Sequence, residues 1–188
     1  MSKVRVLIAS VVATGFAAAI SVGLAWATPS SGTQSTLLGR STFDAFDVTR
    51  RVVVTPPRAT KDRAENEERD RARRRRTVWE VEVEAEPALD VATQMITFQP
   101  GGQSGWHSHP GPVFISVIEG TMTFYESDDP ACAPIVRHAG EGFVDGAHEH
   151  AHIARNESGA PATNLVTYFV PPGAALRTDQ PVPGNCPF

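Results

Sequence analysis

The sequence predicts an all-β fold, and two observations carry this prediction. The chain of 188 residues contains fifteen glycines and fifteen prolines, a composition that favours turns and short strands over long helices. Short apolar or alternating runs also recur between turn signals such as PGG, EGT and HAGEG. Strands at this spacing are typical of an antiparallel sandwich or a small barrel. We expect them at residues 91–98, 113–118, 121–125, 135–138, 142–144, 150–155 and 165–170.

The N-terminal segment has the pattern of an export signal. MSKVR supplies two positive charges, residues 6–27 carry no charge, and the run ends in the small-x-small sequence AWA. We therefore expect cleavage after Ala27 and a secreted or periplasmic mature protein without a membrane span. An uncleaved membrane anchor is the alternative, because about 20 apolar residues can cross a bilayer.

Residues 28–77 are expected to form an extension ahead of a domain at residues 78–188. Apolar positions at 43–48 and 52–54 suit one or two edge strands, whereas 58–76 is nearly all charged and indicates a solvated helix or linker. Its four consecutive arginines could instead bind nucleic acid or anionic lipid, which is the alternative to a solvated segment. The net charge of the chain is −4, so we expect no nucleic-acid partner. The following run, WEVEVE, alternates apolar and acidic residues and predicts a half-buried strand.

Cys132 and Cys186 are the two cysteines of the chain. In an exported protein such a pair is more often a disulfide than two free thiols. We expect a bridge that ties the C-terminal sequence PVPGNCPF to the loop ESDDPACAP, with two buried thiols as the alternative.

Five of the six histidines fall into two short clusters. His107 and His109 share one face of an extended strand, because residues two apart point the same way. His148, His150 and His152 share a face by the same rule. Imidazole suits iron, manganese, nickel, copper or zinc, so the clusters predict a site for one divalent transition-metal ion. The alternative is that these histidines are structural residues at strand ends.

Both clusters lie in segments that are similar to the motifs of the type-2 cupins. Residues 101–120 follow G-x5-H-x-H and end in glycine, as the first motif does, and residues 140–156 end in H-x3-N, as the second motif does. The chain therefore resembles an exported, single-domain cupin. The resemblance implies one jelly-roll β-barrel and, position by position, His107, His109 and His152 as metal ligands.

The sequence departs from the cupin pattern at the glutamate of the first motif. Val113 and Phe114 stand where this residue would fall, so the resemblance leaves the fourth protein ligand missing. His150, His148 and Gln103 are the candidates for a fourth ligand or for a partner of the ligands. We expect an apolar pocket wall from Trp106, Val113 and Phe114.

Two classes of function fit these residues. Three neutral imidazoles leave a bound ion its charge and open positions for a ligand, and the resemblance admits a metal-dependent dioxygenase, isomerase or decarboxylase acting on a small molecule. A non-catalytic cupin that binds a metal or small ligand is the alternative. A second copy of the chain is a candidate partner. Proton-transfer candidates near the motifs are Glu141, Asp145, Glu149 and Tyr125.

Overall fold

The computed structural model describes residues 27–54, 77–147, 150–186 and 188, and this part of the chain contains strands and no helix. The all-β class is therefore confirmed. The predicted signal segment and the charged run at 58–76 lie outside the described residues. Within the described ranges, no helix is long and apolar enough to cross a membrane.

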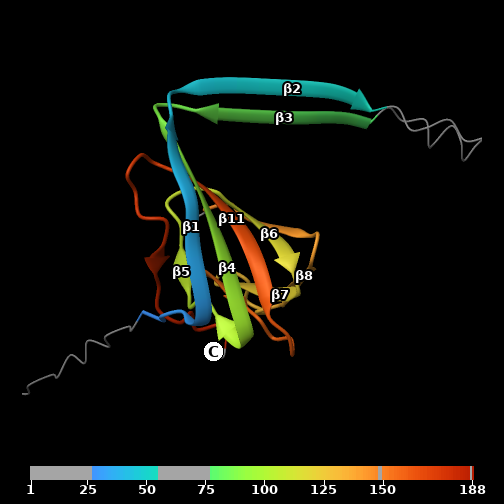
Figure 1. Ribbon diagram of the computed structural model, residues 1–188, viewed down its shortest axis with the longest axis vertical. Coiled ribbons are helices and arrows are strands. Elements are labelled where there is room, and N and C mark those ends of the chain that lie inside the picture. Colours follow the sequence, from blue (N-terminus) through green and yellow to red (C-terminus); the bar gives the residue numbers. More distant parts are fainter. Residues whose placement is uncertain (1–26, 55–76, 148–149, 187) are drawn as a thin grey trace, which may run out of the picture.

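Ten strands form one sheet, which curves into a nearly closed jelly-roll barrel (Figure 1). One wall has the order β1-β4-β11-β6-β9, and the other has the order β12-β5-β10-β7-β8. The strands are β1 (Ser31–Phe43), β4 (Leu89–Gln103), β5 (His107–Ser108), β6 (Val113–Glu119), β7 (Thr121–Glu126), β8 (Ile135–His138), β9 (Gly142–Asp145), β10 (His152–Arg155), β11 (Ala162–Val170) and β12 (Thr178–Asp179).

The main core lies between the two walls. Strand residues alternate between its two sides: Phe98 of β4 and Val166 of β11 are buried, whereas Met95 of β4 faces outward. Phe124 of β7 stacks on Phe143 of β9 with ring centroids 4.4 Å apart, which joins the walls. This alternation decides which side chains of each strand can reach the barrel interior.

Strands β2 (Phe46–Val54) and β3 (Thr77–Ala85) form a separate two-stranded sheet that extends away from the barrel (Figure 1). We call this ribbon the arm. The run WEVEVE is a strand, as predicted, but it pairs with β2 and not with a barrel strand. Trp79, on its apolar face, is 50% exposed, whereas a strand packed on a core would bury this side chain. Strand β1, from the segment predicted as an extension, pairs along β4 within the barrel sheet.

The structure contains the predicted disulfide between Cys132 and Cys186, whose Cα atoms lie 5.4 Å apart. The bridge holds the C-terminus in a second, smaller core. There Trp106 stacks on Phe188, with ring centroids 6.4 Å apart, and Tyr125 meets the same ring edge-on.

Replacing Cys186 with serine is expected to lower the free energy of unfolding by about 4 kcal/mol, because the bridge closes a long loop in the unfolded chain. Equilibrium urea unfolding of the variant and of the native protein measures this difference. Native protein kept in reductant is the matched control and should behave like the variant. Equal unfolding midpoints with and without reductant would show that the bridge does not stabilise the fold.

Candidate metal centre

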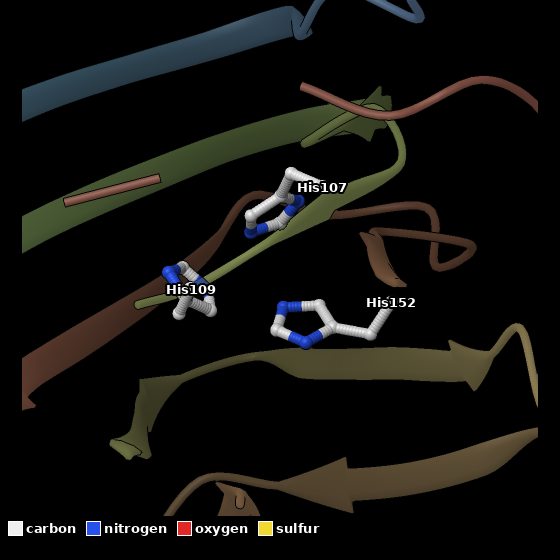
Figure 2. Close-up of side chains that lie close together, drawn as sticks. All are labelled: His107, His109 and His152. Carbon is white, nitrogen blue, oxygen red and sulfur yellow. The ribbon is translucent and has the colours of Figure 1, made fainter. Parts of the chain in front are cut away.

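Three histidines from both predicted clusters meet inside the barrel. Strand β5 pairs with β10 so that His107 lies directly opposite His152, and His109 follows β5 on the same face as His107. Figure 2 shows the three rings pointing toward one another from these two segments. One possible ligand atom from each ring lies within 4.8 Å of the other two, close enough for small ring rotations to bring all three onto one ion.

The backbone fixes which nitrogen two of these rings present. Nδ1 of His107 lies 2.8 Å from the carbonyl oxygen of Gly105, and Nδ1 of His109 lies 2.6 Å from that of Leu176. A carbonyl oxygen only accepts, so in both neutral rings Nδ1 carries the proton and Nε2 keeps its lone pair. Metal-binding histidines in proteins are held by such contacts.

Asp145 performs the corresponding role for His152. It is the last residue of β9, its side chain is 1% exposed, and its Oδ2 lies 2.8 Å from Nδ1 of His152. Burial opposes ionisation of this carboxyl group, but the contact with His152 and the backbone N–H of Ala147 outweigh it and lower the pKa of Asp145 to about 2. A carboxylate behind the ring leaves Nε2 of His152 as the ligand atom and offsets part of the charge of a bound ion.

The other two rings are neutral at physiological pH. Burial, together with the neighbouring His152, holds the pKa of His107 well below its usual value. The same two causes lower the pKa of His109 to about 4. Neutral imidazole is the form that binds metals, so both rings are ready to coordinate without losing a proton.

The metal-free protein is expected to lose stability as the pH falls from about 6.5 to about 4. Between these pH values His109 is protonated in the unfolded chain but remains neutral in the folded chain, because its pKa is lower there. Lowering the pH therefore favours the unfolded state. His109 alone should remove roughly 3 kcal/mol by pH 4. Urea unfolding at several pH values measures the slope. The His109→Gln variant should have a shallower slope; equal slopes would contradict the depressed pKa.

The histidine cluster borders a cavity of about 550 Å³. The hydroxyl group of Tyr168 donates to Oε1 of Gln94 at 2.9 Å, and burial raises the pKa of Tyr168 to about 12, so it stays a proton donor. Arg177 contacts Asp179 and donates to the carbonyl oxygen of Ser104 at 2.9 Å. The remaining wall is mixed, with apolar residues Ile96, Phe98, Ile115 and Val166 and the buried amide Asn164.

The two described candidates for a fourth ligand, His150 and Gln103, are not part of the cluster of three. His150 precedes β10, and its Nε2 lies 3.8 Å from Oδ1 of Asp145, so it reaches the cluster through that carboxylate. Gln103 lies at the end of β4, opposite Arg155. His148 and Glu149 lie outside the described residues. Asp145, predicted only as a proton-transfer candidate, is the partner that the histidine spacing did not reveal.

The predicted pocket wall is corrected by the structure. Phe114 is 50% exposed on the outer face, because it is the neighbour of the fully buried Val113 and adjacent strand residues point to opposite faces. Val113 belongs to the main core, and Trp106 belongs to the second core, where its Nε1 donates to the carbonyl oxygen of Phe188 at 2.9 Å. None of the three lines the cavity.

Several solved structures are similar to part of this chain. No curated protein matches the chain. A cupin superfamily protein of Desulfitobacterium hafniense is 15% identical over 43% of this chain and 68% of its own, with a TM-score of 0.37. A protein of Klebsiella pneumoniae with a double-stranded β-helix domain is 17% identical over 49% and 76%, with a TM-score of 0.42. A sugar phosphate isomerase of Silicibacter pomeroyi is 24% identical over 41% and 48%, with a TM-score of 0.36.

The sequence itself matches the family described as "Cupin domain" over residues 94–168. This range contains all three clustered histidines and the strands from β5 to β10 that position them. The chain therefore contains a cupin domain at residues 94–168.

Proposed function

We propose that the protein binds one divalent transition-metal ion through His107, His109 and His152 and uses it to hold a small molecule in the adjoining cavity. The observation that supports this best is that each Nδ1 atom already has a contact of its own, while one possible ligand atom of each ring lies within 4.8 Å of the other two. Histidines that served only to pack the core would not need to gather beside a cavity, whose wall includes His107 and His152.

A bound ion would supply Lewis-acid chemistry or, in the case of iron, oxygen chemistry, as in a metal-dependent oxygenase or isomerase. The chain's own residues would orient the small molecule. Tyr168 offers a protonated hydroxyl, Asn164 a buried amide and Arg177 a guanidinium at the cavity wall. Asp145 would keep the ring of His152 in position.

Non-catalytic binding of the ion or of a small ligand is the second candidate function, and one observation favours it. Asp179 is the carboxylate among the described residues of the cavity wall, and it is engaged by Arg177. Tyr168, with a pKa raised to about 12, is a poor base. Few groups on this wall are therefore suited to accept a proton from a substrate.

We also propose that the protein acts in an oxidising compartment outside the cytoplasm. The disulfide between Cys132 and Cys186 supports this, because such bridges persist mainly in exported proteins. The N-terminal sequence pattern supports it independently.

Metal titration of the purified protein tests the proposal. Calorimetry should give one ion per chain, and a small-molecule screen by thermal shift should find ligands that stabilise the loaded protein more than the metal-free protein. Ligands that stabilise the loaded and the metal-free protein equally would show that the ion does not help to hold the small molecule. A chain that binds no ion from the series manganese, iron, nickel, copper and zinc would show that the site is not a metal centre.

A further inference from the structure

The two strands that carry opposing histidines of the cluster, β5 and β10, share a very short ladder. Among the described residues, β5 has two members, and its register with β10 consists of the single pair His107 and His152. One pair in a ladder fixes the separation of two strands poorly, because few hydrogen bonds join them. The spacing of these two ligands therefore depends on contacts that hold β5 against β10 from outside the ladder.

The second core supplies such contacts on the back of the two strands. Trp106, next to His107, and Ile153, next to His152, are both buried in this core. Adjacent residues of an extended chain point to opposite faces, so the histidines face the barrel interior while Trp106 and Ile153 face away from it. Packing in the second core therefore supports both ligand-bearing segments from behind.

Cys186 and Phe188 complete the second core, and we call these two residues the C-terminal cap. The ring of Phe188 stacks on Trp106 and meets Tyr125 of β7 edge-on, with ring centroids 6.4 Å and 4.9 Å away. The guanidinium of Arg155, on β10, lies over the same ring, 4.1 Å from its centroid. The carbonyl oxygen of Phe188 also accepts a hydrogen bond from Nε1 of Trp106 at 2.9 Å. One residue of the cap thus connects the segment before β5 with β7 and β10.

The disulfide holds the cap in place. It joins Cys186 to Cys132, in the loop between β7 and β8. Beside the cap, Nδ2 of Asn185 donates to the carbonyl oxygen of Asp129 at 2.6 Å and approaches that of Glu126 at 3.4 Å. With the bridge open, these hydrogen bonds and the packing of the cap would have to outweigh the conformational entropy that a released C-terminal segment gains. The bridge is therefore the strongest single link between the cap and the barrel.

We propose that the disulfide between Cys132 and Cys186 sets the affinity of the histidine cluster for its metal ion. This inference rests on the proposed metal binding by that cluster. With the bridge closed, the cap supports β5 and β10 from behind and keeps His107 opposite His152. With the bridge open, the segment around Trp106 loosens, and the two ligands lose their fixed separation. Ligands that must be ordered again when the ion binds hold it more weakly.

Closing the bridge requires an oxidant, and a protein that donates its own disulfide supplies it. The thiolate of one cysteine attacks the donor's disulfide and forms a mixed disulfide, from which the second thiolate displaces the donor. Two electrons and two protons pass to the donor, which leaves with two thiols. The chain therefore binds its ion weakly while the cysteines are reduced and tightly once they are oxidised. This order suits the oxidising compartment proposed above.

The double variant Cys132→Ser/Cys186→Ser of the full chain tests the proposal. It cannot form the bridge, so the experiment needs no thiol reductant, which would itself bind the metal. In calorimetric titration with zinc or nickel, the variant should still bind one ion per chain. Its dissociation constant should be about tenfold higher than that of the native protein, an effect typical of losing a group that positions a metal ligand. In the metal-free variant, amide hydrogen exchange should become faster at 105–109 and 151–155 but not in β4 or β11.

Two variants at Phe188 separate the cap from the bridge. Phe188→Ala keeps the disulfide but removes the ring that contacts Trp106, Tyr125 and Arg155, so it should also raise the dissociation constant. Phe188→Tyr keeps a ring at this position and should bind the ion as tightly as the native protein. If Phe188→Ala binds as tightly as the native protein, the cap does not connect the bridge to the cluster.

Val117→Ala is the matched control for a general loss of stability. Val117 is buried in the main core on β6 and does not line the cavity, so its truncation destabilises the fold without opening the second core. Its metal affinity should equal that of the native protein. Equal dissociation constants for the native protein and the double serine variant would overturn this inference alone, as would an equally large loss in Val117→Ala. A native chain that binds no ion would overturn the proposed function and this inference with it.

Discussion

Alanine at His107, His109 or His152 is expected to lower the affinity for the metal ion by at least about 100-fold. Removing only the partner of a metal-binding histidine typically costs about 10-fold to 100-fold, and loss of the ligand itself should cost more. The cluster contains three ligand groups and no spare one among the described residues, so a lost imidazole cannot be replaced from within it. Isothermal titration calorimetry with zinc or nickel measures the change for each variant.

His138→Ala is the matched control for this series. His138 is an exposed histidine of β8 that contacts Thr121 at 3.1 Å and lies outside the cluster. Its removal should leave stoichiometry and affinity unchanged. Asp145→Asn should give an intermediate loss, since the amide keeps the shape but not the charge behind His152. Full stoichiometry and affinity in both His107→Ala and His152→Ala would show that the histidines are structural.

Introducing glutamate at Val113 is expected to lower the stability of the metal-free protein and to raise its affinity for the metal ion. The Val113 side chain is completely buried, and its neighbours in the sheet are Asp145 on β9 and Tyr168 on β11. A carboxylate buried there without metal should lower the free energy of unfolding by about 3 kcal/mol. With metal, the same carboxylate restores the ligand of the cupin pattern and should tighten binding, so the ion should recover much of the lost stability.

Val113→Gln separates charge from size in this experiment. Glutamine has nearly the same volume and should destabilise the metal-free protein as well, but it should bring no gain in metal affinity. Thermal unfolding with and without zinc measures both variants. If Val113→Glu binds zinc no more tightly than Val113→Gln, the side chain at this position does not reach the ion.

The sequence predicts the ligands better than it predicts their surroundings. His107 and His109 are visible because their spacing on a strand is local, and His152 follows from the second motif. The contact between Asp145 and His152 depends on how β9 and β10 approach each other in the barrel. The spacing of residues along the sequence does not predict this approach. The sequence therefore indicates Asp145 only as one of several acids near the motifs.

The pocket wall differs from the prediction for a related reason. The missing glutamate could align with Val113 or Phe114, and only the actual register decides which of the two faces inward. The run WEVEVE shows a third limit, because alternation predicts a strand with one apolar face but does not say what covers that face. Pairing with β2 puts this strand on the arm, away from the barrel core.

Phe43 and Leu89 face each other as the last pair between β1 and β4. The whole arm lies between these two residues in the sequence. It is therefore an insertion in the turn of the β-hairpin formed by β1 and β4. A short turn of two to five residues is enough to close such a hairpin. The barrel thus does not depend on the arm for the continuity of its chain, and the arm can vary in length or sequence while the histidine cluster stays in place.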